Sequence, residues 1–285
     1  MVAFDVPDVE YTRYSNRQLA AIPLAVLALA LVVLAGWYVM TGAPVTPGIA
    51  FTGGSELQVV TDDSQAAIES AFATEPESVR PVRGEDSYII TFQSTDTDAI
   101  RQSADRAGYE VESVQGTSAT FGSRTQRLGF LGLGAAFAGM AVLVFAMFRT
   151  FIPSVAVVLS AFSDIVIPLA LMNVFGIKLS LGTVAALLML IGYSVDSDIL
   201  LNNHILRRRG DFYESTYRAM RTGVTMTLTS LSAMAVMAIV AWYFDIPLLP
   251  DIGVVLVFGL TADLMNTYLM NVSLLRWYKY EGVAR

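Results

Sequence analysis

The chain contains six long runs of apolar residues. A long segment separates the first run from the second, and short polar segments separate the others. A helix needs about 20 consecutive, mostly apolar residues to cross the hydrocarbon core of a bilayer. We therefore predict six membrane-spanning helices, at residues 19–40, 129–148, 152–175, 179–206, 219–244 and 253–275. The first run is too long for the apolar core of a signal peptide, and no small-residue cleavage pattern follows it, so we expect an uncleaved anchor.

Residues 41–124 show a different pattern, in which short apolar stretches are interrupted by turn residues. Alternation with a period of two predicts strands, and apolar residues three and four apart predict helices. The expected strands are 56–60, 78–82, 87–92 and 109–114, the expected helices are 63–74 and 96–108, and a turn is expected at Gly84. The order β-α-β-β-α-β is that of a ferredoxin-like split βαβ unit. The predicted fold class is an α-helical polytopic membrane protein with six transmembrane helices and an inserted α+β ferredoxin-like domain.

The composition supports a membrane protein, because 54% of the residues are hydrophobic and only 15% are charged. That is too apolar for an ordinary soluble domain. The chain's net negative charge lies in residues 41–124, which contain thirteen acidic and five basic residues, a net charge of −8 against −7 for the whole chain. We interpret this acidic segment as a solvated surface and expect no nucleic-acid partner.

Arginine and lysine in the short loops predict the orientation, because they accumulate on the cytoplasmic side of a membrane. They flank alternate span ends at Arg13, Arg17, Arg149, Arg207, Arg208, Arg209, Arg218, Arg276, Lys279 and Arg285, and the opposite short loops contain only Lys178. We expect both termini to be cytoplasmic and the protein to lie in the cell membrane. The expected parts are a cytoplasmic N-terminus (1–18), a first span (19–40), an extracytoplasmic domain (41–124), a five-span bundle (125–275) and a cytoplasmic C-terminus (276–285).

Five charged residues lie within or close to the predicted spans: Asp164, Asp196, Asp198, Arg221 and Asp263. An aspartate at the bilayer centre costs about 2.5–3.5 kcal/mol on insertion scales, so such residues usually pair or act. Asp196 lies near the middle of its span, which favours a functional role. Asp196 and Asp198 are about 200° apart around a helix, so they cannot point the same way. In the structural alternative, Asp164 and Asp263 are buried hydrogen-bonding groups and Arg221 is an interfacial anchor.

No pattern typical of an enzyme or a metal site is present. The chain has no cysteine and one histidine, and no group of His, Cys or carboxylate residues has the spacing of metal ligands. The glycine-rich stretch at residues 129–139 has Phe137 where a nucleotide-binding loop needs its third glycine. We predict no enzymatic activity, no cofactor and no metal ion.

Several short motifs carry a resemblance to a known family of membrane proteins. Members have an Asp-Phe-x-Gly-Gly motif after the first span, and its matching residues are Phe51, Gly53 and Gly54. Their fourth span carries a Gly-Tyr-Ser motif, matched by Gly192, Tyr193 and Ser194. An Arg-Thr pair in the fifth span and an aspartate in the third are matched by Arg221, Thr222 and Asp164. Over nearly its whole length the chain resembles archaeal-type SecF, the smaller subunit of the SecDF protein-export complex.

The chain departs from the family pattern in three places. Ala50 replaces the acidic residue of the first motif, and Ser163 replaces a histidine before the third-span aspartate. In the fourth span, Asp196 and Ser197 stand where bacterial members have Asn and Asp, although Asp196 matches the sister subunit SecD. The resemblance therefore favours Asp196 over Asp198 as the coupling residue. It also implies that the glycines of the first motif form a hinge through their backbone geometry.

The resemblance implies a role in protein export. It places the chain in the resistance-nodulation-division (RND) transporter superfamily and implies a SecD-like subunit, a SecYE-type channel, a translocating polypeptide and the lipid bilayer as partners. A proton gradient would act by protonating a membrane aspartate and biasing the outer domain between two orientations. Sodium could replace the proton in a high-salt organism, and the sequence leaves this choice open.

Three other functions remain open at this stage. The chain could be half of an RND-type small-molecule exporter, although such chains usually carry both halves. An intramembrane aspartyl protease also needs two membrane carboxylates, but its Gly-x-Gly-Asp signature is missing before Asp263. A non-catalytic scaffold would use the aspartates only to hold helices together.

Overall fold

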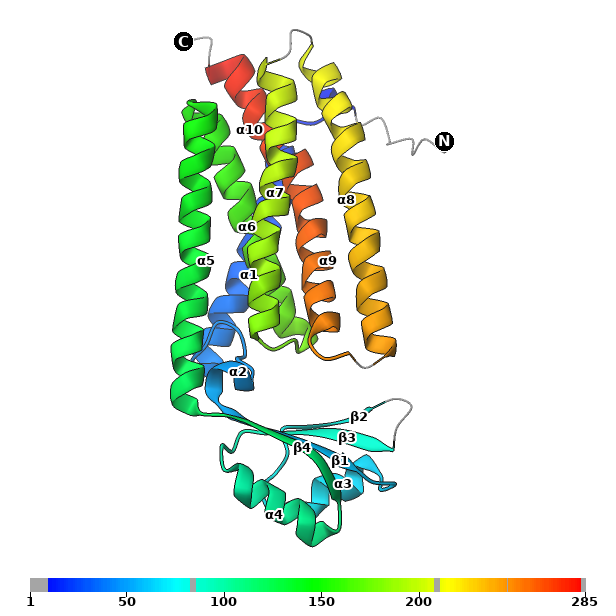
Figure 1. The fold of residues 1–285 in the computed structure, drawn as a ribbon. Helices are drawn as coiled ribbons and strands as arrows, with labels where there is room; N and C mark the ends of the chain where they lie inside the picture. The colour runs from blue at the N-terminus through cyan, green and yellow to red at the C-terminus, as the bar shows by residue number, and fades with distance from the viewer. Residues whose placement is uncertain (1–9, 83–85, 208–210, 245, 283–285) are drawn as a thin grey trace.

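The computed structural model describes residues 10–82, 86–207, 211–244 and 246–282, and it has two parts, a bundle of long helices and a small α/β domain at one end of it (Figure 1). The bundle helices are α1 (Asn16–Thr41), α5 (Ala119–Phe148), α6 (Phe151–Phe175), α7 (Leu181–Arg207), α8 (Phe212–Tyr243) and the run that starts with α9 (Leu249–Met265). Six helices in the described ranges are long and apolar enough to cross a membrane. The six predicted spans are confirmed. The loop arginines Arg208, Arg209 and Arg285 and the turn at Gly84 lie outside the described residues.

Polar helix ends account for the largest differences from the predicted spans. Helix α5 begins ten residues before the predicted start at 129, because Ser118 accepts a hydrogen bond from the backbone N–H of Phe121 and caps the helix. Helix α8 begins seven residues before the predicted start at 219, behind the cap residue Asp211. Arg221 therefore lies roughly 13 Å along its helix, at 1.5 Å per residue. Apolar runs alone do not reveal such polar extensions.

The sixth span is not a single α-helix. After α9 the chain forms a π-helical segment, η2 (Asn266–Asn271), which is followed by α10 (Val272–Trp277) and a second π-helical turn, η3 (Tyr278–Gly282). π-Helical turns are rare and occur often at functional sites.

The small domain contains a four-stranded sheet with one helix between its first and second strands and another between its third and fourth. Its elements are β1 (Gly54–Val60), α3 (Gln65–Ala71), β2 (Ser78–Val82), β3 (Ser87–Phe92), α4 (Thr97–Ala107) and β4 (Glu110–Thr117). The strand order is β2-β3-β1-β4 and every neighbouring pair is antiparallel. The predicted element order is confirmed, and we interpret this topology as ferredoxin-like. Both helices lie on the face of the sheet that points away from the bundle (Figure 1).

The core of the small domain lies between the sheet and its two helices. Along β1 the burial alternates, so that Leu57 and Val59 face inward and pack with Ile68 of α3 and Ile100 of α4. This alternation is the period-two pattern expected of a strand with one covered face. The domain therefore has a hydrophobic core of its own.

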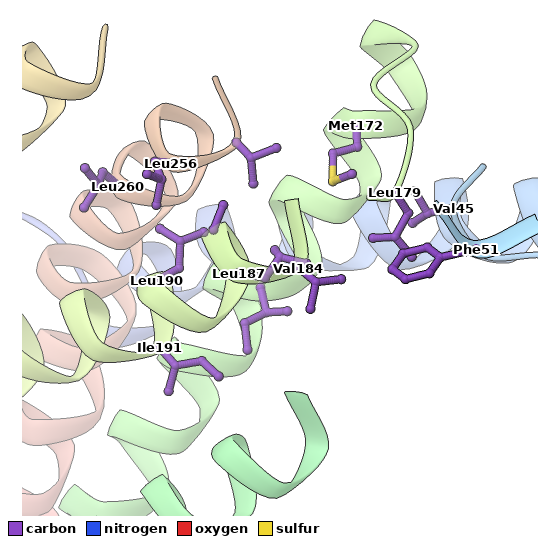
Figure 2. Close-up of a cluster of buried hydrophobic side chains, with 13 residues drawn as sticks. Val45, Phe51, Met172, Leu179, Val184, Leu187, Leu190, Ile191, Leu256 and Leu260 are labelled. Atoms are coloured by element: carbon purple, nitrogen blue, oxygen red, sulfur yellow. The ribbon is translucent and has the colours of Figure 1, made fainter. Parts of the chain in front are cut away.

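The joint between the two parts is tightly packed. Phe51, in the short helix α2 (Ile49–Thr52), is buried against Val45, Leu179 and Val184 at the end of the bundle (Figure 2). The backbone N–H of Gly48 donates to the carbonyl of Leu179 at 2.8 Å. These contacts tie the start of the small domain to the segment that leads into α7.

Two glycines of the first motif adopt backbone conformations that other residues avoid. Gly53 has a φ of 82° and Gly54 a φ of 148°. A Cβ on Gly53 would lie 2.6 Å from the backbone nitrogen of Ala119, at the start of α5. Close approach of two backbones and positive φ both require glycine here, so the motif residues Phe51, Gly53 and Gly54 form the packed joint itself.

Candidate functional site

Three of the four predicted aspartates lie together inside the bundle. Asp164 on α6, Asp198 on α7 and Asp263 on α9 are 1%, 0% and 2% exposed. Asp198 and Asp263 share the hydroxyl of Thr267, and the neighbouring residue Asn266 contacts Asp164. Like charges buried in one place repel one another, and burial opposes each charge. In the described part of the chain no lysine, arginine or histidine forms an ion pair with any of the three.

Asp164 is held by neutral donors from two other helices. The hydroxyl of Ser194 on α7 donates to its Oδ2 at 2.6 Å, and the side-chain amide of Asn266 in η2 donates to its Oδ1. Pro168 lies four residues further along α6 and has no N–H, so the carbonyl of Asp164 lacks its intrahelical donor. Ser194, the last residue of the Gly-Tyr-Ser motif, thus helps to position Asp164.

Asp198 is held by the π-helical segment. Thr267 Oγ1 and Asn271 Nδ2 both donate to its Oδ1 at 2.8 Å, whereas its Oδ2 is buried without a partner. An ionised carboxylate can accept about four hydrogen bonds. This carboxylate is therefore only half satisfied by the protein.

Asp263 shares its donors with other acceptors. Ser197 Oγ lies 2.7 Å from Oδ1 and 2.9 Å from the carbonyl of Ser194, and Thr267 Oγ1 lies 3.3 Å from Oδ1 of Asp263 and 2.8 Å from Asp198. A hydroxyl has one hydrogen and serves one acceptor at a time. The hydroxyls of Ser197 and Thr267 are therefore too few to donate to all the buried oxygens that they contact.

The wide turn of η2 brings the amide side chains to one side of the sixth span. Asn266 contacts Asp164 and Asn271 contacts Asp198, although the two are five residues apart. In an α-helix, residues five apart point about 140° away from each other. The wider turn of a π-helix, with its i→i+5 bonding, brings them closer to the same side of the helix. Our sequence reasoning missed Asn266, Thr267 and Asn271, although polar residues three, four and eight positions after Asp263 in an apolar span were a usable signal.

Asp196 is outside this cluster. Its side chain is exposed, and it borders a groove of about 370 Å³ between α7 and α8 that also touches Tyr193, Ser197 and Thr227. The prediction that the two neighbouring aspartates face different ways is met by this geometry, with Asp198 inward. Asp196 therefore lies on the outer surface of the bundle, beside the groove.

Arg221 is also exposed, and within the described residues it makes no ion pair with Asp196.

Of the fourth-span motif residues, Gly192 faces open space, Tyr193 borders the groove and Ser194 is buried. In the described ranges no three His, Cys, Asp or Glu side chains are arranged to hold a metal ion. The exposed charged residues and the buried cluster are two separate sets.

Comparison with known proteins gives consistent matches. A family model described as "Protein export membrane protein SecD/SecF, C-terminal" matches residues 97–281. The chain is 69% identical to a protein-export membrane protein SecF from Haloferax volcanii, with both chains covered in full. It is 45% identical to a SecF from Methanolacinia petrolearia, over 96% of this chain and 97% of the other.

Solved structures show the same fold. The chain is similar to the crystal structure of SecDF, a translocon-associated membrane protein from Thermus thermophilus, with a TM-score of 0.72 and 17% identity over 98% of this chain. A second structure, of SecDF in a super-membrane-facing form, gives a TM-score of 0.61. The chain spans 40% of the length of each of those chains.

Proposed function

The chain belongs to the SecD/SecF family of protein-export membrane proteins, and from this premise we propose that it uses an ion gradient across the cytoplasmic membrane to promote protein export. It is a SecF-type membrane protein of the transport machinery. We further propose that it works without enzymatic activity of its own.

The buried carboxylate cluster is the observation that carries this proposal. Asp164, Asp198 and Asp263 come from three different helices, lie inside the membrane bundle and have no cationic partner among the described residues. Ionisable residues in such a place are expensive and usually mark an ion pathway. A proton or a metal cation that binds there changes the repulsion between α6, α7 and α9 and so favours one packing of these helices over another.

A path from the cluster to the outer domain supports coupling. Helix α7 carries Asp198, and Leu179, just before this helix, is hydrogen-bonded to Gly48 and packs against Phe51. On the same side, Lys178 forms an ion pair with Glu77 of the small domain. Movement of α7 would therefore reach the small domain through several direct contacts.

The geometry and the fourth-span motif favour different aspartates as the coupling residue. The motif favours Asp196, but Asp198 is the one that joins the cluster. We propose that Asp164, Asp198 and Asp263 form the ion-coupling group. Asp196 and Arg221 would then face a SecD-like subunit across the open side of α7 and α8.

We propose the remaining partners and the orientation by analogy with the family. The complex would stand beside a SecYE-type channel and act on the translocating polypeptide from the outer side, where residues 41–124 lie. Both termini would be cytoplasmic, as the loop arginines predict. Two relatives named SecF, from Haloferax volcanii and Haloquadratum walsbyi, match the full length of this chain, which favours export over an exporter half, and no observation favours a protease.

Export into membrane vesicles, measured with the ion gradient imposed or collapsed by an ionophore, tests the proposal. Asp198→Asn keeps the size of the side chain but removes its charge, and we expect the gradient-dependent part of export to fall by about tenfold or more, the scale seen when a supporting ligand is lost. Asp196→Asn is the matched comparison and should have a smaller effect. An unchanged response to the gradient in Asp198→Asn contradicts the coupling role of the cluster.

A further inference from the structure

We propose that Tyr11, in the segment before the first span, is a positioning residue for ion coupling, because its hydroxyl holds the π-helical segment η2 in shape. Among the described residues Tyr11 forms no hydrogen bond with any of the three aspartates of the cluster. It acts through Tyr268, in the middle of η2, whose neighbours Thr267 and Asn271 donate to Asp198. The inference rests on the ion coupling proposed above and adds to it a residue from the other end of the chain.

The backbone carbonyl of Tyr268 lacks the donor that an α-helix would supply. In an α-helix the N–H of Val272 would donate to the carbonyl four residues earlier, which is that of Tyr268. In this chain the N–H of Val272 donates to the carbonyls of Thr267 and Leu269 instead. A buried carbonyl that loses its donor is destabilising unless another group replaces it. The π-helical bonding of η2 therefore leaves a place for a donor from elsewhere in the chain.

The hydroxyl of Tyr11 occupies this place. It lies 3.0 Å from the carbonyl oxygen of Tyr268, in a buried contact. It also lies 3.7 Å from the sulfur of Met220, but a thioether is a weak acceptor, so the single hydrogen goes to the carbonyl. Tyr11 is only 4% exposed, and its ring belongs to one buried cluster with Leu19, Tyr268 and Val272. A residue 257 positions earlier in the sequence thus takes part in the bonding of η2.

The segment that carries Tyr11 is itself fixed in place. Arg276, in α10, donates from Nη1 to the carbonyls of Tyr11 and Tyr14, both at 2.9 Å. The segment then ends at Ser15, which forms a reciprocal cap at the start of α1. Because the segment is held by the arginine and by the cap, the Tyr11 hydroxyl stays close to the carbonyl of Tyr268.

The side chain of Tyr268 is packed against α8. A Cβ on Gly223 would lie 2.1 Å from the hydroxyl oxygen of Tyr268, so the glycine leaves the space that this oxygen occupies. The backbone of Tyr268 is thus held from the N-terminal segment and its side chain from α8. Thr267 directly precedes Tyr268 and Asn271 follows it by three positions, so a shift at Tyr268 moves both donors of Asp198.

Loss of the Tyr11 hydroxyl favours a return of η2 to α-helical bonding. In the α-helical form Asn266 and Asn271 would point about 140° apart. They could not then contact Asp164 and Asp198 together, as they do in this structure. Tyr11 therefore keeps the two amide side chains on the two carboxylates.

Backbone hydrogen exchange in the purified full-length chain in detergent tests this geometry. Tyr11→Phe removes only the hydroxyl and keeps the ring in the buried cluster. We expect the amides of residues 266–273 to exchange about fivefold faster, equivalent to about 1 kcal/mol for one buried hydrogen bond, and those of α6 to stay unchanged. The control is Tyr14→Phe, because Tyr14 is 47% exposed and its hydroxyl forms no hydrogen bond in the described part of the chain. Equal exchange at residues 266–273 in the two variants would overturn the proposal.

Export into membrane vesicles separates a positioning role from a merely structural one. At equal amounts of membrane protein, we expect Tyr11→Phe to lower the gradient-dependent part of export about threefold or more, with the gradient-independent part unchanged. Tyr14→Phe should change neither part. A general structural defect would lower both parts together, and that result would contradict the positioning role.

Arg276→Gln gives a second test of the same segment. It removes the two hydrogen bonds to the carbonyls of Tyr11 and Tyr14. If the arginine acts by holding Tyr11 in place, this change should also reduce gradient-dependent export. Added to Tyr11→Phe, it should then reduce export little further, because changes that act through one contact are not additive. Fully additive losses would contradict the route through Tyr11.

The failure of this proposal can be told from the failure of ion coupling. If the unchanged chain ignores every gradient, the coupling fails, and faster exchange in Tyr11→Phe still supports the hold of its hydroxyl on η2. If the unchanged chain responds to a gradient and Tyr11→Phe responds equally, the coupling stands and the positioning role fails.

Discussion

The two faces of helix α7 place their aspartates in opposite environments. Asp198 is fully buried, and its carboxylate receives hydrogen bonds from Thr267 and Asn271. Asp196, only two residues away, is exposed beside the groove to α8. The inner face is covered by other helices of this chain, whereas Asp196 on the outer face has no hydrogen bond or ion pair among the described residues. The difference teaches that a charge within a membrane span is explained by its neighbours and not by its depth.

Replacing the buried aspartate on α6 should give the largest loss of stability. Asp164→Leu removes the acceptor of both Ser194 and Asn266, and each orphaned buried donor costs about 1–3 kcal/mol. We expect a loss of about 2–6 kcal/mol, measured as free energy of unfolding in detergent. Asp196→Leu is the matched change on the outer face and should cost little. Equal losses would break the distinction between the two faces.

Two glycines allow the same comparison of a packed with an open surface, and the expected loss of stability is smaller. A Cβ on Gly223 would fall 2.1 Å from the hydroxyl oxygen of Tyr268, whereas one on Gly192 would meet nothing within 4 Å. Overpacking typically costs about 1–3 kcal/mol, so Gly223→Ala should lower the unfolding temperature. Gly192→Ala should leave it unchanged or raise it slightly, because alanine favours a helix. The reverse ranking would show that α8 packs differently against the sixth span.

The smallest effect on stability is expected on the outer face. Arg221→Ala should change the unfolding free energy by no more than about 0.5 kcal/mol, as is usual for exposed positions. It should reduce the amount of a SecD-like subunit that co-purifies, and Arg221→Lys should restore part of it, because lysine keeps the charge but loses the planar fork of arginine. Full retention of the partner in Arg221→Ala would remove this residue from the proposed interface.

The sequence was sufficient for the features that depend on local pattern. The six spans follow from runs of about 20 apolar residues, and strands β2 and β3 begin and end where alternation places them. The start of α8 was missed by seven residues because its first turns are polar and their position is decided by the cap residue Asp211. Caps and polar extensions require knowledge of the chain outside the apolar run.

The site was only partly predictable for a physical reason. The aspartates stood out because charge in an apolar span is rare. Which of them meet could not be read from spacing, since it depends on how α6, α7 and α9 are rotated against one another. The π-helical segment also changes the directions of the side chains that follow it. From the sequence, Asn266 and Asn271 stand three and eight positions after Asp263, a spacing that an ordinary α-helix also has. The arrangement of the cluster is therefore a property of the packed bundle.

Strand β4 and helix α5 together have a mechanical consequence. Only Ser118 separates the last residue of β4, Thr117, from the first residue of α5, and in Figure 1 the strand runs directly into the helix. Along its 30 residues α5 buries only Gly122 and Val144. A displacement of the outer sheet would therefore pass directly to the start of α5, a helix that this chain leaves largely unburied along its length. Movement of the sheet and movement of this membrane helix would then be mechanically linked through a single connecting residue.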